Sequence, residues 1–229
     1  MRDQDPVFDY IWLSHELSRD TPAYGNGERL TVSHEKQISA GSNCNSVKLT
    51  FPNHLGTHVD VPYHFIDTGK KVCDYNVEQW IFHKPKLVLI NIKPNEMITA
   101  SSLHTALSAI NDVDFLLIKT GFEQYRQDNS FWQNSPAFAE DIAFCLKEKF
   151  PSISAIGFDV ISLSCFQQRE LGRKAHYAFL SQDIRIFEDM HLSHLTNNMK
   201  INQIIAMPLR FENADGSPCT VIARVEECK

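Results

Sequence analysis

The stretch His54–Phe65 reads HLGTHVDVPYHF and holds three of the ten histidines of the chain together with an aspartate. Its glycine, its proline and its β-branched residues all disfavour a helix, so the two-residue period of a β-strand applies. On that period one face carries His54, Gly56, His58, Asp60, Pro62 and His64. The opposite face carries Leu55, Thr57, Val59, Val61, Tyr63 and Phe65. We therefore expect one face to pack against a core and the other to present ionisable side chains.

The ionisable face has the residue types that bind divalent metal ions. Two residues advance about 6.6 Å along a strand, so His58 and Asp60 can share one ion at ligand distances of about 2 Å. His54 lies about 13 Å from His58 on an ideal strand, so either the chain bends at Gly56 or two ions lie side by side, and we expect both. Imidazole and carboxylate without cysteine suit Zn²⁺, Mn²⁺ or Fe²⁺, and the affinity series favours zinc. The alternative is a polar strand with surface histidines.

Length and composition indicate an ordinary globular protein. The 229 residues are 43% hydrophobic and have a net charge of −6, and no linker, repeat or low-complexity segment divides them. We therefore expect residues 1–229 to form a single domain. The acidic charge argues against nucleic acid as a partner. No apolar run approaches the ~20 residues of a membrane span, so we expect no membrane contact.

Two further patterns bear on the cellular compartment. The first ten residues, MRDQDPVFDY, have charges where a signal peptide has its apolar stretch, which favours a cytoplasmic location. The six cysteines include no pair at two-residue spacing, which argues against a zinc knuckle or a redox dithiol. We expect reduced thiols that are mostly buried.

Short β-rich segments alternate with helical patterns along the chain. The expected strands are Tyr10–Leu13, Val47–Phe51, Lys86–Ile92, Val113–Thr120, Ile153–Phe158, Ile204–Leu209 and Thr220–Val225. The clearest helix runs from Pro136 to about Phe150, with Ser135 as its N-cap. A weaker helix covers Ala100–Ile110, and a third surrounds His176. This order predicts an α/β or α+β fold with a mixed sheet.

HLGTHVDVPYHF resembles the signature of the cyclase or metal-dependent hydrolase family, which includes bacterial-type kynurenine formamidase and isatin hydrolase. Other segments are similar to further motifs of that family: WLSHELSRDTPAY (12–24), FLLIKTGF (115–122), SAIGFDVISL (154–163), AHYAFLSQDIRIFEDM (175–190) and MPLRFENADGSPCTVIARV (207–225). The resemblance covers nearly the whole chain. It implies a swivelling β/β/α fold, in which a mixed, curved sheet is flanked by helices.

The resemblance also implies the metal ligands. His54, His58 and Asp60 would bind metal, with Asp60 shared between two ions, and His176 and Glu188 would complete the pair of sites. The last two could not be selected from spacing, because a solitary histidine and a glutamate at a strand end have many structural roles. The implied cofactors are two divalent ions per subunit, with Zn²⁺ favoured and Mn²⁺ as the alternative.

Two further roles come from the resemblance. His64 lies beyond Pro62, where the chain leaves the strand, so it could be another ligand or a free base; the resemblance makes it the proton-transferring residue. Tyr24 occupies the place of an aromatic residue that lines the family's substrate pocket, the alternative being a surface aromatic in a turn. The chain departs from the family at Gly25–Gly27, where Pro-Gly-Asp is usual, and at Val160–Ser164, where Ser and an acidic residue are usual.

Other histidines are assigned no role in the site. His191 and His194 in HLSHL are three residues apart, a spacing that on a helix could bind a metal. No carboxylate or cysteine completes that set locally, so we expect a solvated helical face. His15 follows Ser14 near the end of the first strand, and we expect a structural hydrogen-bonding residue unless it borders the pocket.

These features together predict a metal-dependent hydrolase of an amide C–N bond in a small molecule. The resemblance indicates N-formylkynurenine or a related aryl or cyclic amide, with a metal-activated water as nucleophile. A lactone or isatin-type ring hydrolase with the same site is the alternative. A catalytically silent protein that binds metal or a small molecule is the non-enzyme alternative. The resemblance also implies a homodimer or homotetramer.

Overall fold

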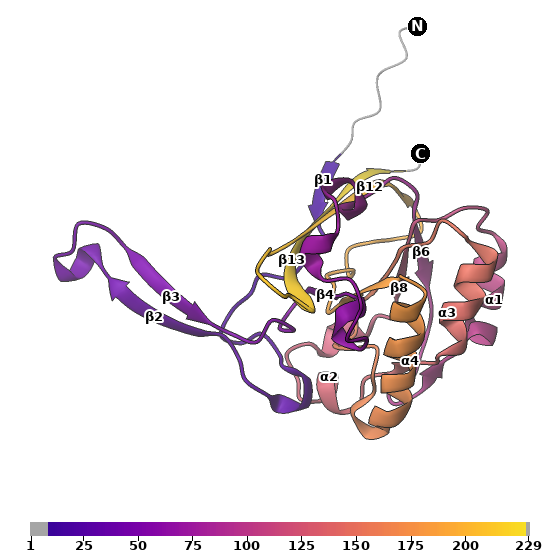
Figure 1. Ribbon diagram of the computed structural model, residues 1–229, viewed down its shortest axis with the longest axis horizontal. Coiled ribbons are helices and arrows are strands. Elements are labelled where there is room, and N and C mark those ends of the chain that lie inside the picture. Colours follow the sequence, from indigo (N-terminus) through magenta and orange to yellow (C-terminus); the bar gives the residue numbers. More distant parts are fainter. Residues whose placement is uncertain (1–8, 228–229) are drawn as a thin grey trace, which may run out of the picture.

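A nine-stranded sheet organises residues 9–227, the part of the chain that the computed structural model describes (Figure 1). Its strands are β1 (Asp9–Trp12), β4 (His58–Asp60), β5 (Ile81–Phe82), β6 (Pro85–Leu89), β8 (Phe115–Lys119), β10 (Ala155–Phe158), β11 (Arg185–Glu188), β12 (Met199–Pro208) and β13 (Gly216–Glu227). The order is β5-β12-β13-β4-β11-β10-β8-β6, and β1 pairs with β13. The strands β6, β8, β10 and β11 are parallel, whereas the other pairings are antiparallel. Because β12 also lies against β6, the sheet curls until it is nearly closed, which confirms the predicted fold class.

Both faces of the parallel strands are covered, which explains why they are apolar without alternation. Leu116 and Ile118 of β8 pack into a core shared with the helices. Phe115 and Leu117, on the other face, pack into a second core under β12 and β13. The helices are α1 (Ala100–Ser108), α2 (Ser130–Gln133), α3 (Asp141–Lys149) and α4 (Arg169–Ser181), and they lie together on one side of the sheet (Figure 1).

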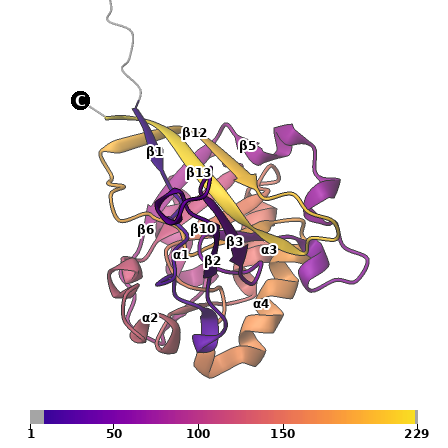
Figure 2. The ribbon, with the colours of Figure 1, turned by 90° about the vertical axis from the view of Figure 1, so that its left-hand side faces the viewer.

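A two-stranded arm projects from the body of the molecule (Figures 1 and 2). It consists of β2 (Thr31–Lys36) and β3 (Ser46–Thr50), which pair antiparallel with each other, and of residues 37–45, which connect them. Three apolar side chains of the arm are exposed: Ile38, Val47 and Leu49. An isolated two-stranded hairpin is marginally stable in water, so the arm has an unburied apolar surface that the rest of the described chain does not cover.

The strand expected over His54–Phe65 is much shorter than predicted. The paired strand is limited to β4, because Gly56 has a left-handed φ of 69° and Pro62 opens a 3₁₀ turn, η3 (Pro62–His64). Proline cannot donate to a ladder and fixes its own φ, which ends the pairing there. Phe65 therefore does not join the apolar face, and its ring stacks on His176 at 4.9 Å between centroids.

The helix expected from Pro136 begins instead at Asp141, with Glu140 as its N-cap residue. Ala137 and Phe138 form β9 (Ala137–Phe138), which pairs parallel with β7 (Met97–Ile98). Phe138 is fully buried against Phe158, so core packing overrides the local helix signal. The other expected strands and the helices α1 and α4 are confirmed. Strand β12 begins at Met199 rather than Ile204, and β13 extends beyond both of its predicted ends.

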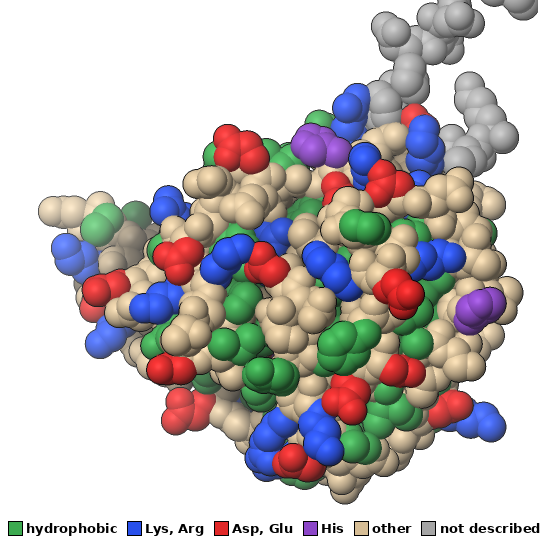
Figure 3. All heavy atoms as spheres, turned by 45° about the vertical axis from the view of Figure 1, so that its right-hand side comes forward, with side chains coloured by type: hydrophobic (Ala, Val, Ile, Leu, Met, Phe, Trp, Pro, Cys, Tyr) green, Lys and Arg blue, Asp and Glu red, His purple; other side chains and the backbone are tan. Residues whose placement is uncertain are grey.

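The cysteines of residues 9–227 form no disulfide, as predicted. Cys165 and Cys219 are buried, whereas Cys44 and Cys73 are exposed, so the expectation of mostly buried thiols is wrong. Cys228 lies outside the described residues. On the face in Figure 3, lysine and arginine are interspersed with aspartate and glutamate. Within the described residues no helix has both the length and the apolarity to cross a membrane.

Candidate active site

One pocket brings together all the residues that the sequence selects as site residues. It has a volume of about 530 Å³. The selected residues that line it are Tyr24, His54, His58, Asp60, His64, His176 and Glu188. They come from the turn η1 (Tyr24–Asn26), the segment from the bend before β4 to η3, helix α4 and the end of β11. Segments that are distant in sequence thus meet at one pocket.

Two imidazoles and two carboxylates converge at the buried end of the cluster. Strands β4 and β11 pair antiparallel with His58 opposite Glu188, and His58 Nε2 lies 3.4 Å from Glu188 Oε2. The same nitrogen lies 3.5 Å from Asp60 Oδ1. From α4, His176 Nε2 reaches Glu188 Oε1 at 3.3 Å and Asp60 Oδ2 at 3.6 Å. The sheet register and one helix therefore bring both imidazoles within 3.6 Å of both carboxylates.

The backbone holds both buried imidazoles in the orientation that a metal ligand needs. His58 Nδ1 donates to the carbonyl of Gly56 at 2.8 Å. His176 Nδ1 donates to the carbonyl of Gly172, also at 2.8 Å. Because a carbonyl can only accept, each Nδ1 bears a proton, and each Nε2 faces the carboxylates. Without an ion Nε2 donates to these carboxylates, which raises the pKa of both rings against the effect of burial. Loss of the Nε2 proton would leave its lone pair for a metal.

A second group of donors lies at the more exposed side of the pocket. His54 Nδ1 contacts Asp60 Oδ1 at 2.8 Å, and its Nε2 contacts Asp215 Oδ2 at 3.0 Å. His64 Nδ1 contacts the same Asp215 oxygen at 2.8 Å. The chain bends at Gly56 and brings the His54 and His58 rings to 5.2 Å between centroids. Of the two sequence explanations for their spacing, the structure shows the bend.

Asp215 is a site residue that the sequence did not reveal. It lies in the loop between β12 and β13, directly before Gly216, whose backbone pairs with Asp60. A Cβ at Gly216 would lie 2.3 Å from a ring carbon of His54, so the absence of a side chain there lets the ring reach Asp215. The sequence signal for Asp215 was the Asp-Gly pair inside the family-like segment 207–225. An Asp-Gly pair by itself indicates only a turn.

The carboxylates of the cluster are ionised. Burial and Asp60 raise the pKa of Glu188, but hydrogen bonds from His176 and His58 outweigh them and lower it to about 2. Burial lowers the pKa of His54, and Asp60 and Asp215 outweigh it and raise the value to about 9. Buried anions of this kind require nearby cationic partners. Asp60 and Glu188 are only 1% and 4% exposed. The base of the pocket therefore has a negative charge that favours binding of a cation.

The donors fit divalent metal ions. Among residues 9–227 they form two groups, His54–Asp60–His64 and His58–Asp60–Glu188, with the ligand atoms of each group within 4.8 Å of one another. Asp60 belongs to both groups. Nitrogen and carboxylate donors without cysteine are the set that zinc, manganese and iron accept. The arrangement therefore indicates a divalent-metal centre.

An aromatic and cationic wall completes the pocket. The Tyr24 ring meets Phe166 edge to face at 5.8 Å between centroids, and the Arg169 guanidinium lies 4.1 Å from the Phe166 ring centre. Gly25 and Asn26 both have left-handed φ, 66° and 54°, and a Cβ at Gly25 would lie 3.1 Å from Phe166. The departure from the family at this loop thus forms part of the wall beside Phe166.

The second departure from the family orients the carboxylate of Glu188 directly. Ser162 Oγ and the Leu163 amide donate to Glu188 Oε1 at 3.1 and 2.7 Å. Asp159, just before this segment, accepts from the amides of Thr120 and Gly121. The altered residues therefore keep Glu188 oriented without supplying an additional acidic donor.

Comparisons with known proteins agree with this geometry. Residues 11–164 match the family model described as Putative cyclase. The kynurenine formamidase of Bacillus mycoides is 32% identical over 217 residues, which are 94% of this chain and 97% of that protein. The kynurenine formamidase of Bacillus anthracis is 32% identical over 215 residues, again 94% and 97%.

Solved structures share the fold. Isatin hydrolase A from Labrenzia aggregata, bound to benzyl benzoate, superposes with a TM-score of 0.82 at 20% identity, over 96% of this chain and 94% of that one. A predicted metal-dependent hydrolase from Bacillus stearothermophilus gives 0.74 at 20% identity, over 95% and 98%. The family model covers more than half of the sequence, and the chain belongs to the Putative cyclase family.

Proposed function

We propose that this protein is a metal-dependent hydrolase that cleaves a non-peptide amide C–N bond in a small molecule. The observation that carries the proposal is the convergence of His58, His176, Asp60 and Glu188 at the base of one pocket. The kynurenine formamidases that match over most of the chain support an aryl formamide such as N-formylkynurenine as the substrate.

We propose two divalent ions per subunit, with Zn²⁺ favoured and Mn²⁺ as the alternative. His58, His176 and Glu188 would hold one ion, His54 the other, and Asp60 would be shared, as its place in both donor groups suggests. When bound, such ions supply a water of lowered pKa and polarise the substrate carbonyl. The carbonyls that hold the Nδ1 atoms of His58 and His176 keep these ligands oriented.

His64 is the residue that we assign to proton transfer. Its Nδ1 donates to Asp215 at 2.8 Å, which leaves Nε2 free to accept a proton in the pocket and return it to the departing nitrogen. An amine leaves poorly unless it is protonated, so this step matters more for an amide than for an ester. The competing role for His64 is that of a third ligand in the group with His54 and Asp60.

The wall of the pocket favours an open-chain substrate with a carboxylate over a neutral ring. Arg169 and Arg173 both line the pocket, and guanidinium groups bind carboxylates through charge-assisted hydrogen bonds. Tyr24 and Phe65 supply aromatic surface for an aryl group. N-formylkynurenine has both features, whereas an isatin-type ring has only the second.

A substrate panel on the zinc-loaded protein tests the reaction. N-formylkynurenine, isatin and an aryl lactone would be compared by kcat/KM at matched concentrations. We expect the formamide to give the highest value. Turnover of the lactam or lactone without turnover of the formamide would reassign the site to ring opening. Absence of turnover with ions bound would leave a silent binding protein.

We also propose that the protein assembles as a homodimer or homotetramer through the arm. The exposed side chains of Ile38, Val47 and Leu49 lie on a two-stranded hairpin that the described residues leave uncovered. Both ends of the arm lead directly to site residues, since β2 follows Tyr24 and β3 precedes His54. A partner that packs on the arm would therefore lie close to the pocket.

A further inference from the structure

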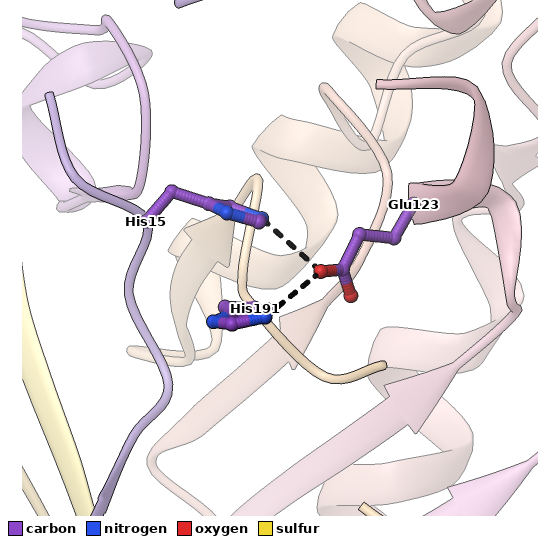
Figure 4. A group of neighbouring side chains, drawn as sticks. All are labelled: His15, Glu123 and His191. Carbon is purple, nitrogen blue, oxygen red and sulfur yellow. Dashed lines mark ion pairs between the residues drawn. The ribbon is translucent and has the colours of Figure 1, made fainter. Parts of the chain in front are cut away.

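A second cluster of imidazole and carboxylate groups is formed by three residues that do not line the active-site pocket (Figure 4). It consists of His15, which follows β1, Glu123, in the turn η6 (Phe122–Tyr125), and His191, which follows β11. Oε1 of Glu123 lies 3.5 Å from Nε2 of His15 and 3.5 Å from Nε2 of His191. The two histidines line a second pocket, of about 1010 Å³, which shares no lining residue with the active-site pocket.

We propose that His15, Glu123 and His191 bind one additional divalent ion, with zinc as the metal that suits them best. Zinc bonds to imidazole nitrogen and carboxylate oxygen at about 2.0–2.2 Å, and tetrahedral geometry then separates neighbouring ligand atoms by about 3.4 Å. The two 3.5 Å separations at Glu123 Oε1 match this value. All three donor atoms lie within 4.8 Å of one another, so one ion can reach them together.

The surroundings of Glu123 leave one of its oxygens available for an ion. Its Oε2 accepts hydrogen bonds from the backbone amides of Leu192 and Ser193 at 2.8 and 2.7 Å. These bonds fix the carboxylate and direct Oε1 toward the two imidazoles (Figure 4). Carboxylates that bind a metal typically also accept hydrogen bonds from neighbouring groups, as Glu123 does here.

His15 is oriented in the same way as the buried ligands of the active site. Its Nε2 is buried and has no hydrogen-bond partner in the described part of the chain. The ring also hydrogen-bonds the backbone of Met190, which must engage Nδ1 and therefore leaves the lone pair on Nε2.

Arg126 places a positive charge near the proposed site, and the carboxylate of Asp189 balances part of it. The guanidinium of Arg126 makes two hydrogen bonds to the carboxylate of Asp189, at 2.8 and 2.7 Å. His191 is 38% exposed, and it lines the second pocket together with His15. Water in that pocket can occupy the remaining coordination position, as in sites that have three protein ligands.

An ion at this position would join three distant segments of the chain. His191 lies three residues after Glu188, so the ion would tie the segment that follows an active-site ligand to η6 and to the N-terminal segment. The expectation of a solvated helical face at HLSHL is wrong, because residues 191–195 are not helical. The carboxylate that HLSHL lacks locally is supplied by Glu123. His15 does not line the active-site pocket, but it lines the second pocket.

Isothermal titration of the full-length, chelator-treated protein with Zn²⁺ tests the proposal without reference to activity. We expect His191→Gln and Glu123→Gln each to bind one equivalent fewer than the unaltered protein. His194→Gln is the matched control, because its ring packs on His191 at 4.7 Å and lines the same pocket but is not one of the three donors. It should bind as many equivalents as the unaltered protein.

Two results would overturn the proposal. One is an unchanged number of zinc equivalents in both His191→Gln and Glu123→Gln. The other is an equal loss in His194→Gln and His191→Gln, which would point to an effect on the pocket rather than on a ligand. His191 is partly exposed, so its substitution should leave the fold intact, and far-ultraviolet circular dichroism of each variant verifies this.

Discussion

The two histidine and carboxylate clusters have the same donor chemistry in different surroundings. The active-site cluster contains two buried carboxylates, Asp60 and Glu188, whereas the second cluster has the single carboxylate of Glu123. The active-site cluster also has a histidine, His64, that is oriented by a separate aspartate and lines a substrate-sized pocket. The difference teaches that donors alone specify an ion, while catalysis requires an additional oriented base and room for a substrate.

Removal of one carboxylate charge from each cluster should show most clearly which cluster supports catalysis. Glu188→Gln should lower kcat/KM by more than about 100-fold, because even the loss of an outer partner of a metal ligand costs 10–100-fold. Glu123→Gln should cause a smaller loss, since Glu123 touches no group of the active-site pocket. Steady-state kinetics with the best substrate of the panel gives both values. Equal losses in the two variants would abolish the distinction between the clusters.

The next largest effect should come from the base that only the active site has. His64→Gln should lower kcat by about 10²–10⁴-fold, the range expected for loss of general acid–base catalysis. Metal content, measured by elemental analysis after gel filtration, should stay unchanged. If the variant loses an ion together with activity, His64 is a ligand, and the proton must be carried by another group.

Asp215 should act as a positioning residue for that base. Asp215→Asn keeps the shape but removes the charge that holds His54 and His64, so kcat/KM should fall by about 10–100-fold. Asp183→Asn is a matched control, because Asp183 also accepts from two side chains, but these are Lys70 and Tyr75, which do not line the active-site pocket. A control that loses as much activity as Asp215→Asn would show that the effect is one of general stability.

The cationic wall should affect substrate choice more than chemistry. Arg169→Met should raise KM for N-formylkynurenine by about 10-fold or more. This factor corresponds to the loss of one hydrogen bond to a charged group. It should leave KM for an uncharged aryl formamide within about twofold. The comparison of the two substrates on one variant is the measurement. Equal increases for both would assign Arg169 to packing against Phe166 rather than to recognition of a carboxylate.

Changes in the arm should alter the assembly of the protein and should have the smallest effect on catalysis. Leu49→Lys should lower the molar mass in sedimentation equilibrium, because a charged side chain opposes burial in an interface. His34→Lys changes an exposed polar residue of the same arm and should leave the mass unaltered. A monomeric unaltered protein, or an unchanged mass for Leu49→Lys, would contradict assembly through the arm.

The sequence predicts features that depend on neighbouring residues and misses those that depend on sheet pairing. Alternation around His58 and Asp60 identified donors because both lie on one strand. Asp215 and Glu123 could not be placed, since the loop before β13 and the turn η6 reach the clusters only after the chain has folded. The early helix start at Pro136 was wrong for the same reason, because pairing of β9 with β7 depends on a distant segment.

Removal and return of metal is the most direct test of the central claim, that the donors around Asp60 hold the ions on which hydrolysis depends. The protein would be treated with a chelator, assayed, reloaded with Zn²⁺ or Mn²⁺, and assayed again alongside elemental analysis. We predict that hydrolysis is lost with the ions and returns when they are restored, and that Glu188→Gln cannot be reactivated. Undiminished turnover by protein without bound metal would contradict the account.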